Sequence, residues 1–127
     1  DGAGRPNGTL VVTADTRLPR RFRMPGAGGR PVLNVGAGAA WSGWGDKPRG
    51  YRGWLLPVAA REPRRLVVLA DGADVISGGC SDQDLLRTYR RVVEASGGAA
   101  VVFGAELCCF PWRPLCAHYG NFTRRRA

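Results

Sequence analysis

The feature that most constrains the fold of this chain is an apolar run that ends in two acids. Residues 66–70 read LVVLA and are followed by Asp71, Gly72, Ala73 and Asp74. A short apolar run rich in β-branched residues and bounded by turn-forming residues predicts a buried strand. We expect this strand to deliver the two carboxylates to a tight turn at its carboxyl end.

The rest of the chain alternates between apolar segments and breaks. Three further segments are predicted as strands: residues 9–14, 31–36 and 99–105. Proline and glycine interrupt residues 16–30, which are predicted as a loop or a poorly formed helix, and the Gly-rich 37–50 is predicted as a loop. Residues 51–61 are expected to hold a short helix that Pro57 interrupts.

One segment carries a clear helical pattern. Apolar residues recur at helical spacing over 82–95, which predicts an amphipathic helix. Ser81 and Asp84 form a capping-box pattern at its start, and the Ser-Gly-Gly of 96–98 is expected to end it. Strands that alternate with helical segments predict an α/β fold, a mainly parallel sheet with flanking helices.

Ligands of such sheets bind outside the carboxyl ends of the strands. Asp71 and Asp74 fall at one such end, and Glu106 falls at another. Two carboxylates on one turn repel each other unless a cation lies between them, and Mg²⁺ or Mn²⁺ prefers such oxygen ligands. The pattern therefore predicts either a divalent-cation site or a polar end to the strand.

Composition narrows the classes of function. The 127 residues are predicted to form a single domain over 1–127, with 1–8 and 120–127 flexible. No apolar run is long enough to span a membrane. The net charge of +9 comes mainly from Arg residues that are scattered along the chain without a nucleic-acid-binding signature, which argues against a nucleic-acid partner. Cys109 and Cys116 are either a small disulfide or two buried thiols.

The order of these motifs resembles a known family. "LVVLADGADV", the helix "DLLRTYRRVVEA" and then "AVVFGAELCCFPW" are similar to the glycosyltransferase region of the procollagen lysyl hydroxylases and related collagen glycosyltransferase-like proteins. That family follows a strand with D-x-x-D and later carries F-S-A-E and C-W-P, which correspond here to 103–106 and 109–111. "LVVTADT" and "VLNVGAGAAW" are similar to its first two strands, so the resemblance covers most of 9–119.

The resemblance implies the N-terminal part of an incomplete glycosyltransferase domain of GT-A type, with a Rossmann-like sheet. Little catalysis is expected from this part alone. Asp71 and Asp74 would hold Mn²⁺ (or Mg²⁺) against the diphosphate of a UDP-sugar. Thr13 and Trp41 would contact the uridine, and Glu106 would serve the sugar or the acceptor.

Family members transfer glucose or galactose to hydroxylysine in collagen-like chains, in the endoplasmic reticulum or Golgi lumen. The resemblance therefore implies UDP-hexose and a protein acceptor as partners, and a secretory or secreted location. From another class of function, the alternative is a non-catalytic domain of the same fold that binds an anionic partner through its basic surface.

Overall fold

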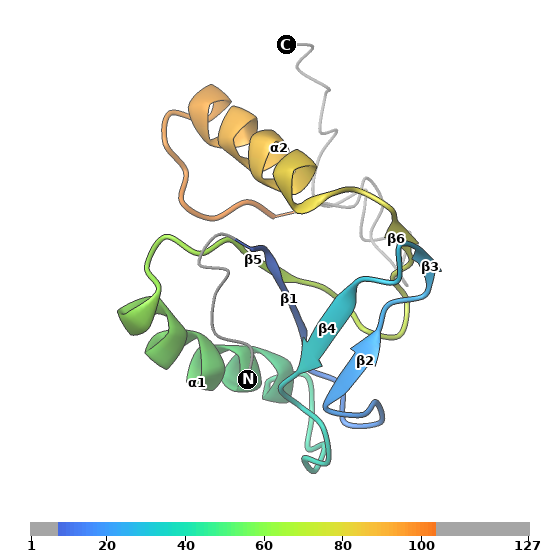
Figure 1. Ribbon diagram of the computed structural model, residues 1–127. Helices are drawn as coiled ribbons and strands as arrows, with labels where there is room; N and C mark the ends of the chain where they lie inside the picture. The colour runs from blue at the N-terminus through green and yellow to red at the C-terminus, as the bar shows by residue number, and fades with distance from the viewer. Residues whose placement is uncertain (1–7, 104–127) are drawn as a thin grey trace, which may run out of the picture. The chain divides into compact units, whose positions relative to one another are not determined.

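The computed structural model describes residues 8–103 of the chain (Figure 1). The chain divides into two compact units, Asp1–Arg91 and Val92–Ala127, and the boundary falls within its second long helix. The first unit contains every strand of the described residues and is a mixed α/β structure with a mostly parallel sheet. This confirms the α/β class and the mainly parallel sheet that the sequence predicts.

The sheet of the first unit has four strands in the order β2-β4-β1-β5. Its strands are β1 (Leu10–Thr13), β2 (Arg21–Arg23), β4 (Pro31–Asn34) and β5 (Val67–Leu69). The central strand β1 pairs in parallel with β4 on one side and β5 on the other, and β2 pairs antiparallel with β4 at the edge. Two short parallel strands, β3 (Gly26–Ala27) and β6 (Ser77–Gly78), form a second small sheet.

The core lies on one face of the four-stranded sheet. Val11 of β1 is the register partner of both Val32 and Val68, so these three side chains lie side by side. Val11, Val32 and Met24 are the buried residues of this cluster, and partly buried apolar side chains pack against it: Phe22, Val68, Ala70 and Val75. Alternation along β1 turns Val12 to the opposite face, where it is also buried. The central strand is therefore buried on both faces.

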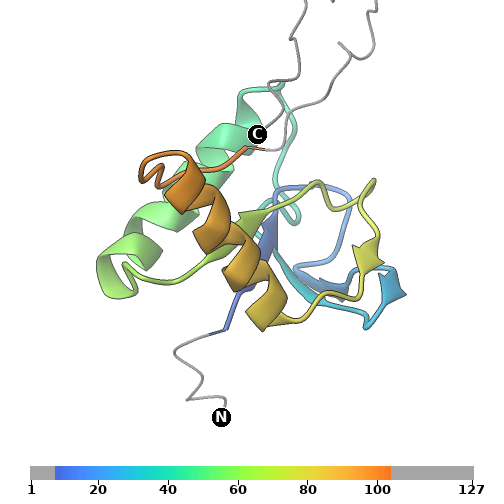
Figure 2. The same cartoon turned by 90° about the horizontal axis from the view of Figure 1, so that it is seen from above.

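Two helices flank the sheet. Helix α1 (Asp46–Arg61) runs along one side of the sheet, as Figure 2 shows from a second direction. Helix α2 (Asp82–Ala95) begins with the predicted capping box, in which the Asp84 N–H donates to Ser81 Oγ (3.1 Å) and the Ser81 N–H donates to Asp84 Oδ2 (3.2 Å). Gly97 and Gly98, both at positive φ, follow its last turn, as predicted.

Helix α1 begins earlier and continues further than the sequence suggests. Residues 46–50, predicted as a loop, form its first turns, and Pro57 lies inside it without ending it. Pro48 lies in the first turn, where a backbone N–H has no helical partner to lose. The prediction that Pro57 interrupts the helix is wrong, because the burial of Val58 and the hydrogen bonds of Tyr51 outweigh the one backbone donor that Pro57 removes.

Two further predictions need correction. Residues 16–30 contain β2 and β3 in place of a loop or helix, because an edge strand tolerates the prolines on either side of β2. Residues 99–103 form no strand, and their apolar side chains at 101–103 are exposed. The remainder of that predicted strand, 104–105, lies outside the described residues. Within 8–103, no helix combines the length and apolarity needed to cross a bilayer.

Candidate functional site

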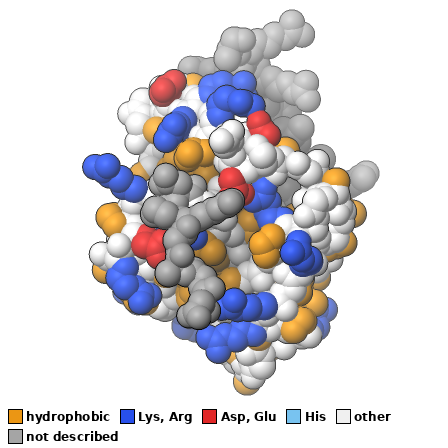
Figure 3. Space-filling model, viewed as in Figure 1, with side chains coloured by type: hydrophobic (Ala, Val, Ile, Leu, Met, Phe, Trp, Pro, Cys, Tyr) orange, Lys and Arg blue, Asp and Glu red, His pale blue; other side chains and the backbone are white. Residues whose placement is uncertain are grey.

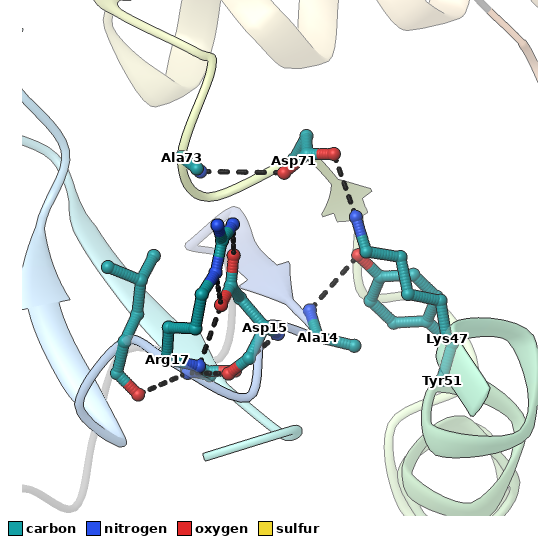
Figure 4. Close-up of polar contacts among 9 residues, drawn as sticks. Ala14, Asp15, Arg17, Lys47, Tyr51, Asp71 and Ala73 are labelled. Carbon is teal, nitrogen blue, oxygen red and sulfur yellow. Dashed lines mark hydrogen bonds and ion pairs between the residues drawn. The ribbon is translucent and has the colours of Figure 1, made fainter. Parts of the chain in front are cut away.

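Charged side chains gather at the carboxyl ends of β1 and β5 (Figure 4). Asp15 follows β1 and is almost fully buried, with its side chain 4% exposed. Its two carboxylate oxygens accept from the Arg17 guanidinium, from Nε at 3.2 Å and from Nη2 at 3.0 Å, and Oδ1 also accepts from the Arg17 N–H at 2.8 Å. These hydrogen bonds from Arg17 lower the pKa of Asp15. The arginine is thereby anchored on one side and open to solvent on the other, with its side chain 78% exposed.

Asn34, the last residue of β4, fixes the loop that carries this pair. Its side chain is buried, and its Oδ1 accepts from the N–H groups of Asp15 and Gly36, both at 3.0 Å. Its Nδ2 donates to the carbonyl oxygens of Asp15 and Leu18, both at 2.7 Å. One amide therefore satisfies four backbone groups that the sheet leaves unpaired at its end.

Helix α1 supplies the partner of Asp71. Lys47 Nζ donates to Asp71 Oδ2 at 2.7 Å, and this hydrogen bond lowers the pKa of Asp71 and raises that of Lys47. One turn further, Tyr51 Oη accepts from the Ala14 N–H at 3.2 Å and donates to the Ala70 carbonyl at 3.3 Å. The helix is thus attached to the ends of β1 and β5 at the same point.

The turn after β5 packs closely on the end of β1. Gly72 is buried, and a Cβ there would lie 2.9 Å from Thr13 Oγ1 and 2.9 Å from Leu18 Cδ1. The Thr13 hydroxyl is fully buried and has no hydrogen-bond partner among the described residues. A contact between this hydroxyl and uridine would require the 71–74 turn to open.

The other predicted site residues lie in different settings. Asp74 is exposed on the same turn as Asp71. Asp15 raises the pKa of Arg17, and the negative charges of Asp74 and Asp71 raise it further. Trp41 lies in the loop after β4, is 47% exposed and packs edge-to-face on Trp44 with 5.8 Å between ring centroids. Glu106, like both cysteines of the possible disulfide, lies outside the described residues.

The acids at this edge could bind Mn²⁺ or Mg²⁺ only if a bound ligand filled the remaining coordination positions of the ion. Both ions accept carboxylate oxygens and take remaining positions from phosphate and water. Among residues 8–103, no group of three or more His, Cys, Asp or Glu side chains could hold a metal ion. Asp71 and Asp74 would therefore supply two carboxylate ligands, and Lys47 would compete with the ion for Oδ2 of Asp71.

Sequence reasoning identified the acids of this edge only in part. It missed five residues that build the site: Asp15, Arg17, Asn34, Lys47 and Tyr51. A signal for Asp15 was present, because it follows β1 as Asp71 follows β5, and parallel strands end at the same edge. No local pattern indicates that Lys47 pairs with an acid 24 positions away.

On the face of the molecule that Figure 3 shows, the basic side chains do not form one continuous patch. Lys and Arg side chains lie there in several separate groups, with acidic side chains among them. This distribution fits the scatter of arginines along the sequence.

Comparisons with known proteins bring no relative to this chain. No family model, no curated protein and no solved structure matches it. The function therefore has to be inferred from the residues of the site.

Proposed function

We propose that this chain is part of a nucleotide-sugar-dependent glycosyltransferase domain of GT-A type. The donor is a UDP-hexose, with glucose or galactose as the sugar, and the acceptor is a protein such as a collagen-like chain that carries hydroxylysine. The proposed setting is the secretory pathway. The motif order along 9–119 and the charged cluster at the carboxyl edge of the parallel sheet support this proposal.

The observation that carries the proposal is the mixture of charges at one sheet edge. Asp15 holds Arg17 with its guanidinium toward solvent, and Lys47 reaches the same edge from α1 beside Asp71. A diphosphate needs positive charge and hydrogen-bond donors where its leaving oxygen gains charge. Arg17 and Lys47 provide both, and a nucleotide at the carboxyl ends of parallel strands would meet them directly.

Asp71 and Asp74 would hold Mn²⁺ or Mg²⁺ in this proposal. When bound, such an ion supplies Lewis-acid stabilisation of the departing UDP. The work of the chain itself is to bind and orient the diphosphate. Lys47, once released from Asp71, would be free to pair with a phosphate oxygen, and Arg17 would keep its orientation because Asp15 holds it from behind.

The test is binding of UDP by calorimetry with and without Mn²⁺. We expect Mn²⁺ to strengthen binding, and Asp71→Asn/Asp74→Asn to remove that increase. The matched control is Glu62→Gln, which removes an exposed acid at the far, C-terminal end of α1 and should leave binding unchanged. If the Asp71/Asp74 variant binds UDP with Mn²⁺ as tightly as the wild type, the proposal fails. Salt-sensitive binding of heparin without any binding of UDP would favour a non-catalytic domain.

A further inference from the structure

A hollow of about 420 Å³ lies beside the charged edge, between the carboxyl end of β4 and the middle of α1. Leu33 and Val35 line it from the sheet side, and Gly50, Gly53 and Trp54 line it from the helix. Its volume falls within the range of small-molecule sites, which are mostly apolar with a few polar groups. Nothing in the proposed transfer chemistry uses this hollow so far.

The two glycines are the first sign that the hollow is a site. Glycine is a poorer helix former than any residue except proline, so two of them inside α1 weaken the helix. Neither is at positive φ, and a Cβ at Gly53 would meet no atom within 4 Å. A Cβ at Gly50 would make only an ordinary contact of 3.9 Å with Ala14. Packing therefore does not require glycine at either position, and the evident result of having it is an open hollow.

The walls of the hollow define the chemistry of its ligand. Trp54 offers a half-buried indole, and Leu33 and Val35 offer half-buried aliphatic side chains. Arg20 adds one exposed cation. Much of the lining is polar, and Asn34 contributes to it. An aromatic wall, hydrogen-bonding groups and one positive charge suit a planar polar ring that belongs to an anionic molecule.

The hollow and the charged edge share one face of α1. Lys47, Gly50, Tyr51 and Trp54 are spaced i, i+3, i+4 and i+7, which places them along one stripe of the helix. Lys47 and Tyr51 reach the strand ends, whereas Gly50 and Trp54 line the hollow. The stripe from Trp54 to Lys47 is roughly 10 Å long at 1.5 Å per residue, a span that a nucleoside diphosphate can bridge.

We infer that this hollow binds the nucleobase of the nucleotide donor, with Trp54 as its stacking wall. The inference rests on the proposed function, which places the diphosphate of the same molecule at Lys47 and Arg17. It also differs from the uridine contacts implied by the resemblance. Thr13 is fully buried, while the hollow is open.

The test uses uridine, which has the base and no phosphate, in an NMR titration of the 127-residue chain. We expect uridine to shift the Gly53 and Trp54 signals. Gly53→Leu, which fills the hollow, should weaken uridine binding at least tenfold while the melting temperature stays equal or rises. Gly53→Ala, which adds only a methyl group, should have a smaller effect. Ala60→Leu places the same side chain at an exposed position of α1 and should leave uridine binding unchanged.

The outcomes separate this inference from the proposed function. If uridine does not bind, or binds Gly53→Leu as tightly as the wild type, the inference is overturned even where UDP binding still depends on Asp71 and Asp74. If Gly53→Leu abolishes uridine binding but UDP with Mn²⁺ gains nothing from those acids, the hollow is a base site and the proposed function fails.

Discussion

Replacing Asn34 with Ala should destabilise the chain more than any surface change. The amide makes four hydrogen bonds of 2.7 to 3.0 Å to backbone groups of the two loops after β1 and β4. Each hydrogen bond contributes about 1 kcal/mol net, which gives about 4 kcal/mol if all four are lost without replacement. Water that enters the space left by the side chain would recover part of this, so we expect a loss of about 2–4 kcal/mol.

Equilibrium unfolding in urea measures this loss. With an m-value of about 1–3 kcal/mol per molar, the midpoint should fall by roughly 1 M or more at unchanged m. Gln83→Ala removes an exposed amide from α2 and serves as the control, with a midpoint close to that of the wild type. A midpoint for Asn34→Ala that matches this control would refute the reasoning, because the buried amide would then do no more than an exposed one.

Two other substitutions test the packing and the charges of the edge. Gly72→Ala should lower the free energy of unfolding in urea by about 1–3 kcal/mol, because the new methyl group would lie 2.9 Å from Thr13 Oγ1. In a double-mutant cycle, Thr13→Ala should recover part of that loss. An additive cycle would exclude the contact. Lys47→Met should raise the pKa of Asp71, which NMR of the Asp71 carboxyl carbon measures. The same substitution should change the free energy of unfolding at pH 7 by no more than about 1 kcal/mol, because the pair is partly exposed. Folding lowers the pKa of Asp71, so its contribution to stability is present above the unfolded value of 3.8 and is lost as the pH falls through the folded pKa. Lys47→Met should weaken this dependence of stability on acidic pH. An unchanged dependence would contradict the pairing of Lys47 with Asp71.

The sequence was sufficient where a local pattern decides the structure. The valines of 10–13 and 67–69 favour strands, and the apolar stripe and capping box of 82–95 fix a helix almost to the residue. Parallel pairing also follows from the alternation of strands and helices.

The failures have a common cause, which is that distant contacts override local preference. Glycine and proline argue against a continuous helix over 46–61, but the burial of Val58 and the hydrogen bonds of Tyr51 stabilise one. The apolar residues 99–103 favour a strand, but a strand needs a neighbour, and no pairing forms there. The site follows the same rule: the position of Asp71 is local information, and its pairing with Lys47 is not.

The account depends most on a divalent cation and a nucleotide meeting at the carboxyl ends of β1 and β5, and paramagnetic broadening by Mn²⁺ tests this directly. In the presence of UDP, Mn²⁺ should broaden the amide signals of 13–17 and 71–74 first, and Asp71→Asn/Asp74→Asn should remove the effect. Broadening that begins instead at the acids of the α2 N-terminus, Asp82 and Asp84, or that ignores the double substitution, would contradict the account.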